Sequence, residues 1–291
     1  MTFPPRERDV VSADDVSRTI RPMSTTGAAR DLATAAMAVV LLSTLVEGPA
    51  IWLLAGILLA AVLFGTLQVL GEGVAAAAGP GVPVEALFAP GVTALAALGS
   101  LRLVPPGVLL VPAILAGGWL LLRVLGMEAR VLASQTGPSG ADRTAVMSTA
   151  LIVGFFAFLG SAALVPGSLP EPGTVSAGPT GAQLATLAAS DALIAFLLGY
   201  RAAALRTTNI RDVAWSALTS AIVVAIAAVA LRAMEIPRLL GPALLVLVFF
   251  LWDAVHGTTP LRGRDRRRLW ETILLAVLGV LVVAWSVRLH A

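Results

Sequence analysis

The sequence predicts an all-α protein, a polytopic transmembrane helical bundle of about nine helices with a cytoplasmic N-terminus and an outside C-terminus. Of its 291 residues, 58% are apolar and 13% are charged, whereas a soluble domain carries about 25% charged residues. The apolar residues form segments near the roughly 20 residues that a helix needs to cross a bilayer. Arginines concentrate in alternate loops, as they do in membrane proteins of defined orientation.

The chain divides into a short tail and a single domain. Residues 1–29 contain Pro4 and Pro5, charges of alternating sign and no apolar core. Such a composition cannot bury enough apolar surface to fold. We therefore expect a disordered cytoplasmic tail at 1–29 and one transmembrane helical domain at 30–291.

Nine apolar segments follow the tail in order. Their approximate bounds are 31–46, 50–70, 84–104, 107–125, 144–165, 184–204, 212–234, 238–256 and 269–289. The first is the shortest, and the turn Glu47-Gly48-Pro49 separates it from the second. The third is the least regular, because Pro90 and Gly91 interrupt an alanine-rich run. Whether 31–46 and 84–104 cross the membrane completely stays open.

Arginine placement sets the predicted orientation. Arginines precede the first span and mark the loops between spans four and five, six and seven, and eight and nine. They are Arg6, Arg8, Arg18, Arg21 and Arg30, then Arg123, Arg130 and Arg143, then Arg201, Arg206 and Arg211, and last Arg262, Arg264, Arg266, Arg267 and Arg268. These loops all fall on one face, which the positive-inside rule makes cytoplasmic. The loop at 71–83 is the exception, since it carries no arginine. At span ends, we expect Arg102, Arg123 and Arg232 to extend toward the lipid headgroups.

Residue types missing from the chain exclude several kinds of site. There is no cysteine and only two histidines, His256 and His290, which excludes disulfides, thiolate metal sites and multi-histidine metal centres. All 20 basic residues are arginine, so no lysine Schiff base or P-loop lysine is available. We expect no cofactor, no metal and no catalytic residue that the sequence alone identifies.

Asp191 is the deepest ionisable residue in the predicted spans. It lies near the middle of the segment 184–204, and an acid at that depth is costly unless it faces protein or water. We therefore expect it to face the bundle interior. It is a candidate site for a cation, a proton or a substrate; the structural alternative is hydrogen bonding to Ser or Thr on neighbouring helices or pairing with an arginine.

Asp253 and His256 form a second constellation near the predicted cytoplasmic end of span eight. They are three residues apart and share one helix face, and an arginine-rich loop that begins at Arg262 follows them. Carboxylate, imidazole and guanidinium could bind a phosphate or act as an acid–base pair. The alternative is that Asp253 neutralises the arginines while His256 lies in the headgroup region.

Three function classes fit these features. The sequence favours a transporter or permease-like protein for a small or amphipathic solute, with Asp191, Asp253, His256 and Arg262 as candidate substrate or ion residues. A non-catalytic membrane subunit that anchors or assembles other proteins is the first alternative, and a lipid-modifying enzyme at the cytoplasmic interface is the second. We expect it in the cytoplasmic membrane of a prokaryote, with lipids and other membrane subunits, not nucleic acid, as partners.

Overall fold

The computed structural model describes most of the apolar part of the chain. The described residues are 25–46, 48–76, 81–134, 139–165, 180–234, 236, 238–256 and a few residues between 274 and 281. Within them the secondary structure is helical, with no strand. The all-α prediction is confirmed for this part of the chain.

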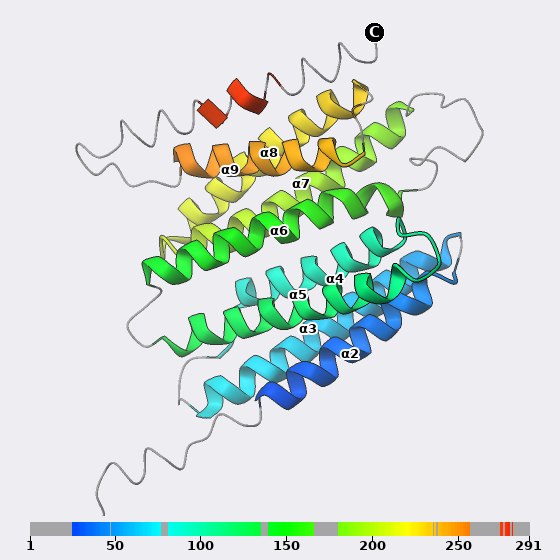
Figure 1. Cartoon of the computed structure of the whole chain (residues 1–291). Coiled ribbons are helices and arrows are strands. Elements are labelled where there is room, and N and C mark those ends of the chain that lie inside the picture. Colours follow the sequence, from blue (N-terminus) through cyan, green and yellow to red (C-terminus); the bar gives the residue numbers. More distant parts are fainter. Residues whose placement is uncertain are drawn as a thin grey trace, which may run out of the picture.

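In the part of the chain that the structure describes, eight α-helices and one short 3₁₀ turn make up the bundle (Figure 1). Their bounds are α2 Thr25–Ser43, α3 Ala50–Ala76, η1 Val84–Leu87, α4 Phe88–Leu101, α5 Leu110–Ala133, α6 Gly140–Leu164, α7 Gly181–Ala204, α8 Ile210–Ala233 and α9 Leu240–His256. Figure 1 shows the helices lying side by side, with successive helices running in opposite directions. This is the arrangement that short loops impose on a helical bundle.

Six of these segments are long and apolar enough to cross a membrane: Ala50–Glu72, Val84–Leu101, Leu110–Ala133, Gly140–Leu164, Gly181–Ala204 and Ile210–Ala233. The chain is thus a multi-pass membrane protein in its composition and helix lengths. The first predicted span corresponds to α2, which is not among the six, and the eighth to α9, a shorter apolar helix. Most of the ninth predicted span, residues 1–24 of the tail predicted at 1–29, and Arg262 lie outside the described residues. Residues 25–29 of that predicted tail are helical, because α2 begins at Thr25.

Pro90 and Gly91 do not break the third segment, contrary to the sequence prediction. A 3₁₀ turn covers Val84–Leu87, and α4 then runs through both residues to Leu101. Pro90 occupies the first turn of α4, where a missing N–H costs no hydrogen bond because those groups have no partner within the helix. Both residues are buried, so the change from 3₁₀ to α geometry occurs at Leu87, ahead of them.

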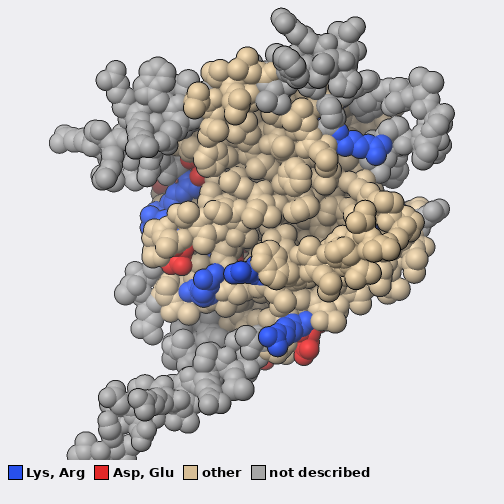
Figure 2. Space-filling view, viewed as in Figure 1, with Lys and Arg blue, Asp and Glu red and all other residues tan. Residues whose placement is uncertain are grey.

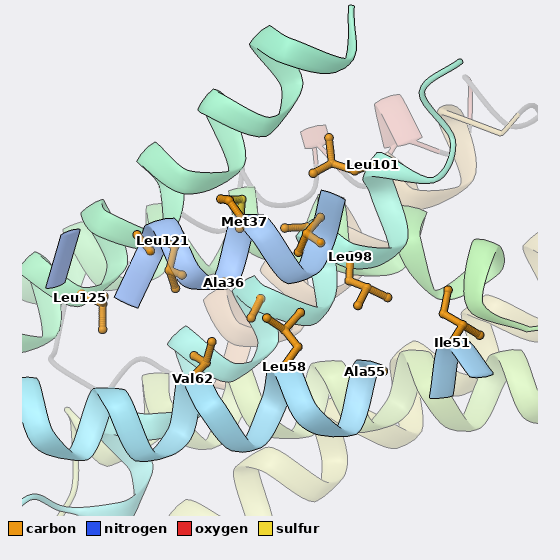
Figure 3. Close-up of a cluster of buried hydrophobic side chains, with 14 residues drawn as sticks. Ala36, Met37, Ile51, Ala55, Leu58, Val62, Leu98, Leu101, Leu121 and Leu125 are labelled. Atoms are coloured by element: carbon orange, nitrogen blue, oxygen red, sulfur yellow. The ribbon is translucent and has the colours of Figure 1, made fainter. Parts of the chain in front are cut away.

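Two hydrophobic clusters divide the bundle into two groups of helices. The first cluster joins α2, α3, α4 and α5 around Val40, Leu58 and Leu98 (Figure 3). The second joins α6, α7, α8 and α9 to the opposite face of α4 around Val153, Leu198 and Leu245. We call α2–α5 the N-terminal group and α6–α9 the C-terminal group, and α4 lies between them with both faces buried.

The two groups meet most closely where α4 crosses α6. A Cβ atom added to Gly99 would lie 2.5 Å from the carbonyl oxygen of Gly160, and one added to Gly160 would lie 2.8 Å from the backbone nitrogen of Ser100. Only glycine therefore lets the two backbones approach this far, as small residues do at membrane helix crossings.

The described arginines define the two ends of the bundle. Arg30, Arg130, Arg143, Arg206 and Arg211 lie at one end, here called the arginine-rich end. Its opposite, the arginine-poor end, carries Arg102, Arg232 and Arg238. Figure 2 shows broad uncharged surface between scattered charged groups, as lipid contact requires. Which end faces the cytoplasm stays a prediction.

Candidate functional site at the buried ion pairs

A buried ion pair joins the N-terminal group to the C-terminal group. Glu128 of α5 lies on the face that packs against the bundle, with Val124, Met127 and Val131 buried beside it. Arg201, in the last turn of α7, donates from Nε to Glu128 Oε1 at 3.0 Å and from Nη2 to Oε2. The two side chains are 0% and 5% exposed. Two parallel bonds fix the guanidinium against the carboxylate in a planar arrangement.

A small cavity lies beside this pair. Its volume is about 10 Å³, and Arg201, Met127, Ala89, Thr149 and Leu198 are among the residues that line it. That volume is near the minimum needed for one water molecule. The cavity lies among α4, α5, α6 and α7, so it occupies the boundary between the two helix groups.

A second buried network joins three helices of the C-terminal group. Asp191 of α7 is 0% exposed, as expected for an acid that faces the bundle interior. Ser161 of α6 donates its hydroxyl to Asp191 Oδ1 at 2.8 Å, and Arg232 of α8 donates from Nη2 to Asp191 Oδ2 at 2.7 Å. The same Nη2 lies 3.2 Å from Ser161 Oγ. Both alternatives for Asp191, an arginine partner and a serine partner, are thus present together.

The expectation that Arg232 and Arg102 extend to the lipid headgroups is wrong. Arg232 turns inward to Asp191, where its charge-assisted hydrogen bond compensates the buried carboxylate. Arg102 donates to the carbonyl oxygens of Ser43 and Val46 at 2.5 and 2.9 Å, which satisfies acceptors at the C-terminal end of α2. Arg123, the third residue of this prediction, is exposed and lies over the Trp119 ring at 5.0 Å.

Asp253 and His256, predicted to act together, contact different residues. Asp253 pairs with Arg206, and both side chains are about one-fifth exposed. His256 is exposed and stacks on Trp252 with ring centroids 3.8 Å apart. Arg262 lies outside the described residues. Asp253 therefore neutralises an arginine, although the arginine comes from the α7–α8 loop.

Four residues of these two networks were not predicted as site residues from the sequence: Glu128, Arg201, Ser161 and Arg232. Glu128 lies beyond the predicted span end at 125, whereas α5 continues to Ala133. The signal was present, because apolar residues continue around Glu128 at helical spacing. Ser161 carries no signal at all, since a serine in an apolar helix is usual and only the fold brings it to Asp191.

The arrangement is suited to binding charge and to holding helices together. Within the part of the chain that the structure describes, no group of three or more histidines and acids could hold a metal ion. Three of the described acids, Glu128, Asp191 and Asp253, each form an ion pair with an arginine. Comparisons with protein-family models, with curated proteins and with solved structures found no match.

Proposed function

We propose that the protein is a transporter or permease-like protein for a small or amphipathic solute, and that the solute passes between the N-terminal and C-terminal groups. The observation that carries the proposal is the Glu128–Arg201 pair, which spans the two groups with both side chains buried. In this proposal the pair closes the path at the arginine-rich end, next to the cavity beside Arg201.

Energetics support a role for this pair beyond stability. A buried ion pair often stabilises a protein no more than apolar residues of the same shape, because desolvating two charges offsets their attraction. Ionisable side chains within membrane spans are rare and mark solute or ion paths. A pair whose attraction is largely offset by the cost of desolvating its charges can separate once water reaches them, which suits a closure that must open.

The packing of α4 on α6 supplies a fixed point for such a movement. Gly99 and Gly160 bring the backbones together near the arginine-poor ends of their helices, whereas Glu128 and Arg201 connect the groups nearer the arginine-rich end. Transporters commonly rock one helix group against another around a binding site. Rocking about the glycine contact would separate Glu128 from Arg201 and enlarge the cavity.

The finer features of the topology belong to the same proposal. We place nine spans in the cytoplasmic membrane of a prokaryote, with the arginine-rich end in the cytoplasm as the positive-inside rule requires. A reporter active only outside the cell should work when fused after Ala291 and fail when fused at 262–266. The reverse pattern would contradict the orientation.

Uptake into proteoliposomes tests the transport role with many candidate solutes at once. Vesicles with purified full-length protein are incubated in a mixture of small metabolites, and their contents are measured by mass spectrometry. We expect some solutes to enter faster than into protein-free vesicles. A cross-link between cysteines placed at Glu128 and Arg201, made with a flexible bifunctional thiol reagent, should stop that uptake.

The matched control is the same pair of cysteines before cross-linking. The chain has no native cysteine, so the reagent reacts only at the introduced positions. Uptake that is equal with and without the cross-link would contradict a path closed by this pair. Contents that never differ from those of protein-free vesicles would contradict the transport role.

A non-catalytic membrane subunit is the second candidate, and a specific observation favours it. The Gly99–Gly160 backbone contact and the three satisfied ion pairs are what a rigid anchoring bundle requires. A cysteine at Thr149, which lines the cavity, separates the candidates. A rigid subunit leaves it unreactive to a water-soluble thiol reagent, whereas a transporter exposes it part of the time.

A further inference from the structure

Asp191 and its partner Arg232 differ in their access to the surface. The Asp191 side chain is 0% exposed, whereas the Arg232 side chain is 20% exposed. Arg232 precedes the last residue of α8 at the arginine-poor end, so a rotation of its long side chain would bring its charge to water. Asp191 lies in the eleventh position of α7 and has no comparable route.

Separation of the pair would leave a carboxylate in an apolar interior. Its remaining described partner is the Ser161 hydroxyl, which is also 2.9 Å from the carbonyl oxygen of Phe158. An isolated buried carboxylate is so costly that such a group takes up a proton instead. One proton on either Asp191 oxygen removes the charge, and Ser161 can remain its hydrogen-bond partner.

No other described charge lies near Asp191 on the helices packed against α7. Helix α6 and η1 pack against α7, and α5 contacts it through Glu128 and Arg201. The acids and arginines of these three elements lie toward the arginine-rich end: Arg123, Glu128, Arg130, Asp142, Arg143 and Glu85. Helix α4 carries no charged residue, and α8 adds only Arg211 and Asp212 at its far end. Arg232 is therefore the charged group that competes with a proton for Asp191.

A metal cation would find too few ligands here. Asp191 and Ser161 together offer a carboxylate and one hydroxyl, whereas Ca²⁺ takes six to eight oxygen ligands and Mg²⁺ about six. A proton needs only one oxygen. The chemistry of the residues thus selects the proton among the cations.

We propose that Asp191 is a proton-binding site, and that a proton on Asp191 and the ion pair with Arg232 exclude each other. The proton comes from water at the arginine-poor end, and Arg232 keeps its charge and turns toward that end. Binding of the proton thus opens the space between α6, α7 and α8. Its release lets Asp191 pair with Arg232 again and closes that space. Coupling of this proton to solute movement rests on the proposed transport function, whereas proton binding itself does not.

Cysteine labelling in lipid nanodiscs tests the site with the full-length protein and no solute. Ala188 is three residues before Asp191, nearer the arginine-poor end, and is buried at 8% exposure. We expect the rate of Ala188→Cys with a water-soluble methanethiosulfonate reagent, relative to the rate of an exposed control cysteine, to rise as the pH falls, by up to about tenfold per pH unit for one bound proton. Rates are normalised to Val108→Cys in the exposed α4–α5 loop, which corrects for the chemistry of the thiol.

Two variants give opposite results if the proposal is right. Asp191→Asn keeps the shape and removes the charge, so Ala188→Cys should react rapidly at every pH. Arg232→Gln removes the competitor, so the increase in rate should begin at higher pH than in the parent. The proposal is overturned if the normalised rate of Ala188→Cys alone does not change with pH. It is also overturned if that rate still depends on pH after Asp191→Asn is added.

A deeper cysteine separates local opening from general loosening. Ala195 is four residues beyond Asp191 and fully buried, and Ala195→Cys should stay unreactive at each pH. Equal labelling at Ala195 and Ala188 would overturn the proposal in favour of loosening of the whole bundle. If Asp191→Asn does not fold, the Arg232→Gln variant alone tests the proposal: its labelling rate should begin to rise at a higher pH than in the parent, and no such shift would overturn the proposal.

The outcome is independent of the transport experiment. Labelling that follows pH in a protein that moves no solute supports the proton site and contradicts the proposed function. Solute uptake together with labelling that ignores pH contradicts the proton site alone.

Discussion

The two fully buried acids among the residues that the structure describes have arginine partners that differ in exposure. Glu128 pairs across the two helix groups with Arg201, which is itself buried, whereas Asp191 pairs within the C-terminal group with Arg232, which reaches the surface. Arg201 and Asp191 lie ten residues apart on the same helix, α7. One helix thus carries a pair in which both side chains are buried and a pair in which one side chain is at the surface.

The difference concerns what happens when each pair is broken. If Glu128 and Arg201 separate without rearrangement of the helices, two charges are left in an apolar interior. If Asp191 and Arg232 separate, only the carboxylate stays inside. The first pair therefore requires a movement of helix groups to open, and the second requires only a side-chain rotation and a proton.

Loss of one member of the cross-group pair should have the largest effect on stability. Arg201→Met leaves the Glu128 carboxylate buried without its partner, and removal of one partner of a buried pair costs about 3–5 kcal/mol. We expect a corresponding loss in the free energy of unfolding, measured by denaturant titration in mixed micelles. An effect below about 1 kcal/mol, the range of exposed pairs, would contradict the buried geometry.

The double variant Glu128→Met with Arg201→Met sharpens this result. Removing both charges also removes the desolvation cost, so most of the lost stability should return. In the proteoliposome assay, the same double variant should show altered uptake although it is stable. Recovery of stability with unchanged uptake would leave the pair a purely structural role.

The glycine contact should be the next most sensitive feature. Gly160→Ala places a Cβ against the backbone of Gly99 and Ser100, and backbone cannot give way as a flexible side chain does. We expect a loss of about 3 kcal/mol, the upper part of the usual range for overpacking. Gly126→Ala is the matched control, because nothing lies within 4 Å of its added Cβ. Equal stabilities of the two variants would contradict the close approach of α4 and α6.

The sequence predicted the helices better than the ion pairs, and the reason is physical. Span length and hydropathy are local properties, so α3, α5, α6, α7 and α8 could be read directly from the chain. Arg232 could not be placed, because an arginine at a span end gains by extending to headgroups or by turning to an acid, and the choice depends on Asp191 being within reach. Glu128 was missed because polar residues after 125 resemble a loop, although their apolar neighbours keep the helical period.

Asp191→Asn should cost less than Arg201→Met, because the remaining Arg232 can rotate to the surface. The loss is limited to the charge-assisted hydrogen bonds, about 2 kcal/mol. Denaturant titration at neutral pH measures it under the conditions used for Arg201→Met. If Asp191→Asn proved the more damaging variant, Arg232 would have no route to water, and the contrast between the two pairs would not hold.

The partly exposed pair of Arg206 and Asp253 should have the smallest effect. Both side chains are about one-fifth exposed at the arginine-rich end, so water screens the charges and either can be solvated alone. Asp253→Asn should change the free energy of unfolding by about 1 kcal/mol or less, as exposed pairs do, and added salt should reduce the difference further. Salt should leave the effect of Arg201→Met almost unchanged, because ions do not reach that pair. A large, salt-independent effect of Asp253→Asn would place this pair with the buried ones and would restore Asp253 as a candidate for a functional role near His256.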